Sequence, residues 1–545
     1  MRSRLQKEAP STLFGRFCRR LRRAQVECAD QHRIQKIIRA VDENAPLSTE
    51  KRPVIFFNAS TRLAGLSLNA AFSLISSWAV RLSGAPVVYF VCERGMSRCV
   101  LGTQRDNVKA LPPCRDCVAF SRRIFDEKAT RSFVFDPDPA LENELADLDL
   151  PALETFVFHD LPLGKLVLPS LRWILRRHHL VDDPPTRFLF RQYILSAWGV
   201  AREFTCLLDE TDPAAVVLFN GMFYPEAVAK TISNQRGVRA ISHEVALRPL
   251  TGFFTTGEAT AYPIDIPQNF DLTPAQEARL DAYLEQRFQG KFRMAGVQFW
   301  PEMNDLSQEF WQRAAGFRQI VPVFTNVIFD TSQGHANVVF PHMFAWLERV
   351  LEIIRAHPDT LFVLRAHPDE TRPGKESRES VADWVAQNRV AELSNVLFIP
   401  SDEYLSSYEL IQRSKFIMVY NSTIGLEASL LKAPVLCAGK ARFTQLPTVF
   451  FPETPEAFAG MAEEFISAEK IKVPPKFNRN ARRFLYTQLY RTAIPFDAFI
   501  EDSGVWQGYV RLKDFPWQAL QPQNSPSLRV VVEGILEGKP FLLDD

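Results

Sequence analysis

Short apolar segments recur along the chain, and each one runs into polar residues that precede a helical pattern. Examples are 53–58, 86–92 and 214–220 in the first half, and 361–365 and 416–420 in the second. A strand that is apolar at every position is buried on both faces, which is the condition of a parallel sheet covered by helices. The sequence therefore predicts an α/β protein built on parallel sheets.

These strand and helix patterns form two series separated by an irregular stretch that contains tryptophan. We expect two Rossmann-like domains facing a cleft, at residues 51–317 and 318–479. A basic helical extension is expected at 1–50, and a helix followed by a tail at 480–545. Helices are expected at 376–393 and 480–500, and the last forty residues look irregular. Ligands of such sheets bind outside the carboxyl ends of the strands, so the loops after the strands are the places to search.

Charge and cysteine content exclude several classes of protein. The chain has 64 Lys and Arg against 63 Asp and Glu, so it has no overall attraction for nucleic acid. Eight cysteines in 545 residues do not make a secreted disulfide scaffold. The start has no signal-peptide pattern, and the least polar stretch, 63–80, is too polar to span a bilayer. We therefore expect a cytoplasmic protein with reduced thiols.

The first 25 residues are strongly basic, with eight Lys and Arg against Glu8 alone. Apolar residues recur within this segment at helical spacing (Leu13, Phe14, Phe17 and Leu21). One interpretation is an amphipathic helix that makes a peripheral contact with the inner face of the membrane. The other is a solvated terminus with a few docking hydrophobic side chains. The sequence leaves both open.

A second open question concerns Cys92, Cys99, Cys114 and Cys117, which have six, fourteen and two residues between them. The last pair forms Cys-x-x-Cys, half of a zinc knuckle, and four thiolates can close a tetrahedral structural site. The first gap is too long for the usual knuckle spacing. A reduced or transient dithiol is the alternative.

The loop after the strand at 361–365 carries one candidate binding site. A buried strand ends here in Arg365, His367, Pro368, Asp369 and Glu370. Pro368 holds the preceding His367 in an extended conformation at the sheet edge. The imidazole can donate to a phosphate oxygen, and the Arg365 guanidinium can reinforce it. A solvated turn is the alternative.

The loop after the strand at 416–420 carries a second candidate binding site. Asn421, Ser422 and Thr423 precede a helix that has Gly425 and Glu427 in its first turn. Free N–H groups at a helix start, together with the hydroxyls, can bind a phosphate. Gly425 permits close approach, and Glu427 can accept hydroxyls of a ribose or sugar. Helix capping explains Ser, Thr and Glu, but leaves Gly425 and the polar cluster without a reason.

Taken together, His367-Pro368 followed by Ser422-Thr423 resembles the paired His-Pro and Ser-Thr motifs of bacterial sialyltransferases and polysialyltransferases of the GT-B fold. The longer blocks 365–370, 406–410 and 420–428 are more similar to capsule polysaccharide and surface carbohydrate biosynthesis proteins. Residues 325–330 match a further strand-end block of those proteins. The likeness covers about 321–441 well and extends thinly to 219–221 and 243–244.

The resemblance implies a GT-B glycosyltransferase whose C-terminal domain binds a nucleotide sugar, with a CMP- or CDP-type donor favoured. His367, Ser422 and Thr423 would hold the phosphates. The donor-binding residues it implies are Asn326, Asp330, Arg365, His367, Pro368, Glu370, Ser407, Tyr408, Asn421, Ser422, Thr423, Gly425 and Glu427. Ser407, Tyr408 and Glu427 would lie near the base or ribose. No cofactor or metal is expected, because cationic side chains and the helix dipole stabilise the leaving phosphate.

The resemblance also implies a catalytic base from the N-terminal domain. Sialyltransferases of this group use an acidic pair followed by Gly, whereas this chain has His243 and Glu244 followed by Val245. Either residue can take a proton from an acceptor hydroxyl. A structural pair that caps a strand is the alternative. Asn220 and Gly221, at a neighbouring strand end, are candidates for binding an oligosaccharide or glycolipid acceptor.

Two other functions fit the same scaffold. A non-hydrolysing nucleotide-sugar epimerase also places His-Pro and a polar loop around a nucleotide sugar, but no clear set of acids is present in the first half. A non-catalytic scaffold for polysaccharide assembly is the other alternative, and the intact polar loops disfavour it.

Overall fold

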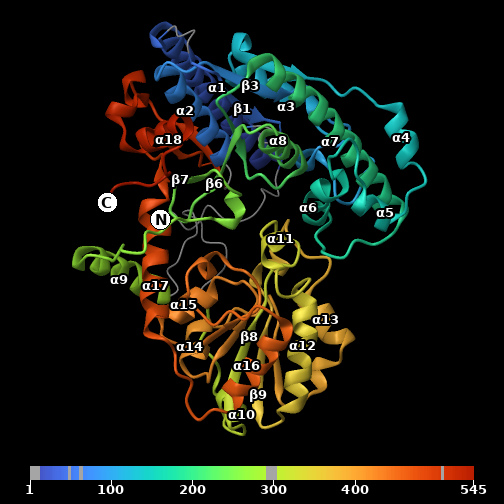
Figure 1. Ribbon diagram of the computed structural model, residues 1–545, viewed down its shortest axis with the longest axis vertical. Helices are drawn as coiled ribbons and strands as arrows, with labels where there is room; N and C mark the ends of the chain where they lie inside the picture. The colour runs from blue at the N-terminus through green and yellow to red at the C-terminus, as the bar shows by residue number, and fades with distance from the viewer. Residues whose placement is uncertain (1–12, 47–50, 60–64, 290–302, 505–507) are drawn as a thin grey trace.

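The computed structural model describes residues 13–46, 51–59, 65–289, 303–504 and 508–545, which form two α/β domains (Figure 1). The first domain contains a seven-stranded sheet. Its strand order is β13 (Ile494–Pro495), β7 (Thr251–Thr255), β6 (Arg239–Val245), β5 (Ala215–Phe219), β1 (Val54–Asn58), β3 (Val87–Cys92), β4 (Thr130–Phe133). From β6 to β4 all neighbours are parallel.

Helices cover both faces of this sheet, as its continuous apolar strands require. One face packs against α1 (Leu13–Asn44), α2 (Leu68–Leu82) and α18 (Pro526–Glu537). The other packs against α6 (Leu163–Leu175), α7 (Pro184–Thr211) and α8 (Tyr224–Gln235). Three further helices, α3 (Cys114–Ile124), α4 (Pro139–Leu145) and α5 (Leu150–Thr155), lie in the connections.

The second domain is a five-stranded sheet in which every neighbour is parallel. Its order is β10 (Val396–Ile399), β9 (Thr360–Arg365), β8 (Gln319–Phe324), β11 (Ile417–Val419), β12 (Val435–Cys437). One face is covered by α12 (Met343–Ala356), α13 (Val381–Gln387) and α16 (Pro455–Ser467). The other is covered by α10 (Gln308–Ala314), α14 (Ser407–Gln412) and α15 (Ile424–Leu430). The predicted α/β class with two Rossmann-like domains is confirmed.

The chain crosses between the domains more than once. Helix α9 (Pro274–Phe288) leaves the first domain, and α17 (Pro475–Tyr486) leads back toward it (Figure 1). Strand β13 then adds to the edge of the first sheet by pairing antiparallel with β7. A small antiparallel sheet joins β14 (Ile500–Asp502), β15 (Tyr509–Leu512) and β2 (Leu66–Ser67). The C-terminal segment is thus part of the first domain's core.

Three expectations about helices are wrong in detail. The last forty residues are not irregular, because α18 is a regular helix with its Ser525 cap and Gly538 end, packed on the first sheet. The helix expected at 376–393 spans only α13, because the Ser380–Asp383 capping box starts it late. The helix expected at 480–500 ends as α17 and a π turn, Thr487–Arg491, because the chain then joins the sheet as β13.

The N-terminal prediction concerns residues that the structure covers only in part. Helix α1 begins at Leu13, so residues 1–12 and the side chains of 13–24 lie outside the described part of the chain. The membrane-surface interpretation therefore stays a prediction. Within the described residues, no helix has both the length and the apolar character that crossing a membrane would require.

The carboxyl edges of the two sheets meet at the domain interface. Helix α11 (Gln333–Ala336), which follows β8, lies between the domains in Figure 1. Its His335 pairs with Glu258 of the first domain at 3.0 Å and contacts the Thr260 hydroxyl at 2.9 Å. The loop after β5 is close as well, because a Cβ on Gly334 would lie 3.6 Å from Met222.

Candidate active site

The strand order of the second sheet brings the predicted donor loops to one edge. Strand β8 lies between β9 and β11, so the loops that carry His367, Asn326 and Ser422 follow three adjacent parallel strands. Because neighbouring strands lie about 4.8 Å apart, the loops after β9 and β11 begin about 10 Å from each other. A diphosphate or nucleotide can span that separation.

His367 is fixed by its own backbone. Pro368 begins a short 3-10 helix, Pro368–Thr371, and the His367 ring caps it by accepting the Asp369 N–H at Nδ1, 3.1 Å away. Desolvation lowers the pKa of His367, against the opposing charges of Asp369 and Asp330. The ring is thus neutral at pH 7, and an acceptor at Nδ1 places its proton on Nε2. His367 can then donate one hydrogen bond to a phosphate oxygen.

Ser422 and Thr423 present several donors together. Ser422 is buried, Thr423 is exposed, and neither hydroxyl forms a hydrogen bond with the described residues. Their carbonyl oxygens accept the N–H groups of Gly425 and Leu426, each at 3.0 Å. Helix α15 has only seven residues. The hydroxyls and local N–H groups therefore matter more here than a long helix dipole.

Two sets of polar contacts, made by consecutive residues at the start of α14, involve four further predicted donor residues. Arg365, which is 5% exposed, donates to the Ser407 hydroxyl. The next residue, Tyr408, donates to Glu427, and Glu427 also pairs with Arg287 from the end of α9. Burial acts to lower the pKa of Arg287, but the charge of Glu427 outweighs it and raises that pKa. Arg287 was missed by sequence reasoning, because nothing local marks it as a partner of Glu427.

Two buried amide oxygens at this edge have no hydrogen-bond partner among the described residues. One is Oδ1 of the predicted Asn326, and the other is Oε1 of Gln333 on α11. Gln333 is 3% exposed, and its Nε2 donates to Oδ1 of the predicted Asn421 at 3.3 Å. Orphaned buried acceptors of this kind need donors such as ribose, sugar or base groups. No sequence signal pointed to Gln333, which lies in a one-turn helix.

Other predicted donor residues have different surroundings. Glu370 is 2% exposed and accepts the Val381 N–H at the start of α13, so its carboxyl points into the protein. Burial raises the pKa of Glu370 to about 8. Asp330 is exposed and accepts the Ser332 N–H at 2.9 Å. The geometry does not bring Glu370 to the other donor residues.

Across the interface, Glu244 is held by three donors. Its carboxylate accepts Nδ2 of Asn220 at 2.9 Å, Nδ2 of Asn69 at 3.1 Å and the Val245 N–H at 2.8 Å. Asn220 and Gly221 have φ of 62° and 81°, a turn that glycine favours and asparagine tolerates. The predicted acceptor residue Asn220 therefore orients the predicted base. Asn69, on α2, was not foreseen.

His243 is buried behind this carboxylate. It is 1% exposed, and its ring lies among Phe72, Phe219 and Phe254. Burial lowers the pKa of His243 to about 3, so the ring is neutral. Its Nδ1 lies 3.3 Å from Oδ1 of Asn69, and Asn69 in turn donates to Glu244. The geometry favours Glu244 over His243 as the group that meets an acceptor.

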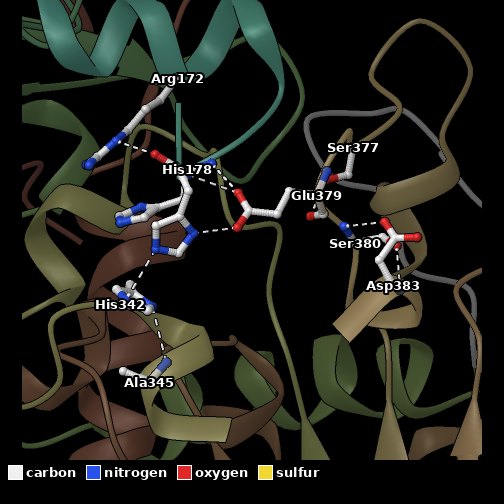
Figure 2. A network of polar contacts seen from close by, with 9 residues as sticks. Arg172, His178, His342, Ala345, Ser377, Glu379, Ser380 and Asp383 are labelled. Atoms are coloured by element: carbon white, nitrogen blue, oxygen red, sulfur yellow. Dashed lines mark hydrogen bonds and ion pairs between the residues drawn. The ribbon is translucent and has the colours of Figure 1, made fainter. Parts of the chain in front are cut away.

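A second polar network ties the domains together beside the site (Figure 2). Glu379 of the second domain accepts the N–H groups of His178 and His179 at 2.8 and 3.0 Å and the His179 ring at 2.5 Å. The other nitrogen of His179 lies 3.3 Å from His342, which caps α12. Arg172 of α6 donates to the His178 carbonyl at 2.9 Å.

The four candidate zinc cysteines line one cavity of the first domain. All four carry free thiols, and burial raises the pKa of Cys99 to about 12. Within the ranges that the structure describes, no set of three or more His, Cys, Asp or Glu is arranged to hold a metal ion. The four thiols are therefore not arranged as a closed zinc site in the described part of the chain.

Comparisons with known proteins bear on the second domain. Residues 309–446 match the family described as capsule polysaccharide biosynthesis protein, which confirms the resemblance there. No curated protein sequence matches the chain.

Solved structures match over longer stretches. The Thermosulfurimonas dismutans KpsC β-Kdo 2,4 transferase shares 12% identity over 50% of this chain and 79% of its own, with a TM-score of 0.34. The KpsC β-Kdo 2,7 transferase from the same organism has 14% sequence identity to this chain. The match covers 62% of this chain and 90% of the transferase, with a TM-score of 0.31. The S. aureus MnaA–UDP structure has 10% sequence identity to this chain. The match covers 89% of this chain and 96% of MnaA, with a TM-score of 0.27. At such scores these likenesses add nothing to what the strand order shows.

Proposed function

We propose that this chain, whose residues 309–446 match the capsule polysaccharide biosynthesis protein family, is a GT-B glycosyltransferase. It moves a sugar from a nucleotide-sugar donor, with a CMP- or CDP-type donor favoured, to a growing surface or capsular polysaccharide or a glycolipid. It requires neither metal nor cofactor and works in the cytoplasm. Its basic N-terminus is the candidate for a peripheral membrane contact.

One observation carries the proposal. Three adjacent strand ends, after β9, β8 and β11, present His367, Asn326 and Ser422–Thr423 at the edge where the two domains meet. Oδ1 of Asn326 and the hydroxyls of Ser422 and Thr423 have no hydrogen-bond partner among the described residues. The carboxylate of Glu244 belongs to the opposing domain and is held by two amides. Donor binding on one side and proton acceptance on the other is the division of labour that sugar transfer needs.

The donor loops stabilise the leaving group. As the anomeric C–O bond to phosphate breaks, negative charge develops on the departing nucleotide. Nε2–H of His367 and the hydroxyls of Ser422 and Thr423 donate to the phosphate oxygens, and buried Arg365 contributes positive charge nearby. Fixed donors of this kind stabilise developing charge without reorganising. Asn326, Gln333 and Glu427 remain for the base, ribose or sugar hydroxyls.

Glu244 supplies the base. It accepts the proton of the acceptor hydroxyl while that oxygen forms its bond to the anomeric carbon. Asn69 and Asn220 hold the carboxylate in one orientation, and the neutral His243 holds Asn69. His243 therefore acts as a positioning residue.

The first test is nucleotide binding. We expect the full chain to be stabilised by at least one of CMP, CDP, UDP and GDP in a thermal-shift assay, by about 2.7 kcal/mol at a hundredfold excess over Kd. His367→Ala loses a hydrogen bond to a charged phosphate, so binding weakens about ten- to hundredfold. His357→Ala is the matched control, because His357 precedes β9 at the opposite edge of the sheet. Equal weakening in both variants, or no response to any nucleotide, contradicts the proposal.

The second test separates transfer from epimerisation. Glu244→Gln should lower transfer to an oligosaccharide acceptor by about 10²- to 10⁴-fold, the usual contribution of a general base. The nucleotide-induced thermal shift should persist in this variant, which shows that it folds. Epimerisation of a nucleotide sugar without any acceptor would instead favour the epimerase.

A further inference from the structure

Arg176 is a buried cation at the domain interface. It follows α6 in the left-handed conformation, with φ of 60°, and is 7% exposed. Its guanidinium carbon lies 4.3 Å from the ring centre of Trp173 and 5.0 Å from that of Phe329, which belongs to the second domain. Such stacking covers the faces of a guanidinium and leaves its N–H edge for hydrogen bonds.

That edge has no partner within the protein as described. Nε and Nη1 of Arg176 are both buried and form no hydrogen bond with any described residue. Buried charges in proteins are almost always paired, because removing them from water is costly. The two orphaned donors therefore indicate that a ligand belongs beside them.

The acids nearby already have partners. Glu376 accepts the Gly374 N–H at 2.9 Å and lies 3.8 Å from Arg105. Asp369 pairs with Arg372 at 3.3 Å. Burial, then the repulsion of Arg105 and Arg372, lowers the pKa of Arg176 to about 10, so the group stays cationic at neutral pH. Glu376 and Asp330 act against this lowering through their charges, but neither forms a hydrogen bond or ion pair with Arg176 among the described residues.

Arg176 cannot easily move to solvent, because its loop is pinned to the second domain. Its carbonyl accepts the Arg378 N–H at 2.8 Å. His178 and His179, which follow directly, donate their N–H groups to Glu379 (Figure 2). The buried guanidinium is therefore a built feature of the interface.

The position of Arg176 relates it to the donor site. Phe329 and Asp330 follow β8, the central strand of that site, and both Asp330 and Arg372 act electrostatically on His367. Arg176 itself belongs to the first domain, which carries the proposed base. Through its contact with Phe329, Arg176 therefore joins the domain of the proposed base to the loop after β8.

We propose that Arg176, flanked by Arg105 and Arg372, forms an oxyanion subsite that takes a carboxylate or phosphate group of the acceptor. That this group belongs to an acceptor rests on the proposed function; the oxyanion site itself does not. A carboxylate would come from an acidic sugar unit, and a phosphate from a phosphorylated glycan or glycolipid. Either orphaned nitrogen can share a fork with Nη2, so the guanidinium can offer two parallel hydrogen bonds to either group through the Nε–Nη2 or the Nη1–Nη2 edge.

The test measures oxyanion binding by the full chain without any reaction. Thermal shifts are recorded with inorganic phosphate and with glucuronate, against sodium chloride of equal ionic strength and against glucose. We expect a saturable stabilisation by at least one oxyanion. Arg176→Gln should raise its half-saturation concentration at least tenfold, since hydrogen bonds to a charged group are lost. Arg349→Gln is the matched control, because Arg349 pairs with Glu352 on α12.

Further measurements distinguish a carboxylate from a phosphate ligand, and the Arg176 subsite from the donor site. A response to phosphate alone indicates a phosphorylated acceptor, and a response to glucuronate alone indicates an acidic sugar. The response must survive in His367→Ala, which removes the proposed donor contact. If Arg176→Gln does not fold, Arg105→Gln should weaken the response two- to fivefold. An unchanged response in the Arg176 or Arg105 variant, or no oxyanion response in the wild type, overturns the subsite; failure of nucleotides to bind overturns only the donor assignment.

Discussion

At the scale of the residue, burial decides which ionisable groups are available for chemistry. Glu244 is near the end of β6 and Glu370 follows β9, and both were predicted as site residues from these positions. Glu244 is half-buried with two amides directed at it, whereas Glu370 is 2% exposed with one backbone N–H. The first environment orients the carboxyl group of Glu244 by hydrogen bonds, whereas burial of Glu370 favours its neutral acid.

The protonation of Glu370 predicts a pH-dependent stability. The pKa of Glu370 is about 8 in the folded protein, above the ordinary value of 4.5. The contribution of Glu370 to the stability of the fold is therefore complete below pH 4.5 and is lost as the pH rises through 8. Glu370→Gln mimics the protonated acid and removes this loss. We expect the variant to match the wild type near pH 4.5 and to be more stable at pH 8.5. The upper bound on this gain is about 1.4 kcal/mol for each pH unit between the two pKa values.

Urea unfolding at pH 5 and pH 8.5 measures this difference. Glu144→Gln, on the exposed surface of α4, is the control and should show no such trend. A gap between Glu370→Gln and the wild type that narrows toward pH 8.5 would show that Glu370 is ionised in the folded protein.

At the scale of the element, α15 has a structural constraint in addition to its expected role in binding. Gly425 sits in its first turn, where a Cβ would lie 3.0 Å from Cζ of Phe443 and 3.1 Å from Cγ2 of Val419 on β11. Glycine therefore allows a close approach of the helix to the sheet, which a Cβ would oppose unless Phe443 or Val419 shifted by a few tenths of an ångström. That approach is what places the Ser422–Thr423 turn at the strand end.

We expect Gly425→Ala to destabilise the protein by about 1–3 kcal/mol, the usual cost of overpacking a core. Gly460→Ala in α16 is the control, because a Cβ there meets no atom within 4 Å. The control should gain about 0.5–1 kcal/mol from helix propensity. Thermal or urea unfolding of both variants decides the point, and equal effects would show that packing at Gly425 is not the constraint.

At the scale of the whole molecule, polar contacts fix how the two domains meet. His335 reaches Glu258 and Thr260 on one side, and Glu379 reaches His178 and His179 on the other. The hydrogen bond to Glu379 raises the pKa of His179, while burial lowers the pKa of His342 beside it. The interface thus places His179, whose pKa is raised, next to His342, whose pKa is lowered.

The His179–Glu379 contact predicts a pH-dependent loss on mutation. The pKa of His179 in the folded protein is raised above the ordinary 6.5. The contact therefore contributes fully to the stability of the fold below pH 6.5, and this contribution is lost as the pH rises through the pKa of His179 in the folded protein. Glu379→Gln should therefore cost more at pH 5.5 than at pH 9, by about 1 kcal/mol or less because His179 is half-exposed.

Urea unfolding at the two pH values gives the comparison, and limited proteolysis near the domain interface reports whether the domains separate. Glu392→Gln is the control, since Glu392 pairs with Arg389 within the second domain. A larger loss at pH 9 than at pH 5.5 would contradict the assigned sign.

The strands and the loops that carry chemistry follow from local patterns in the sequence. Continuous apolar runs and the polar residues that end them are such patterns, so the α/β class and the loops at His367 and Ser422 could be predicted without a structure. Helix ends do not follow from local patterns in the same way, because the competition between a helix and a sheet edge, as at β13, depends on distant strands.

Which side chains meet depends on the assembled fold. The strand order β9-β8-β11 joins three loops far apart in sequence. Arg287, Gln333, Asn69 and Arg176 lie in segments without a motif, and each gains its importance from a partner, or from the lack of one among the described residues, across the fold. Burial and pairing are properties of the folded chain, because the dielectric surroundings of a group are set by residues that are remote along the sequence.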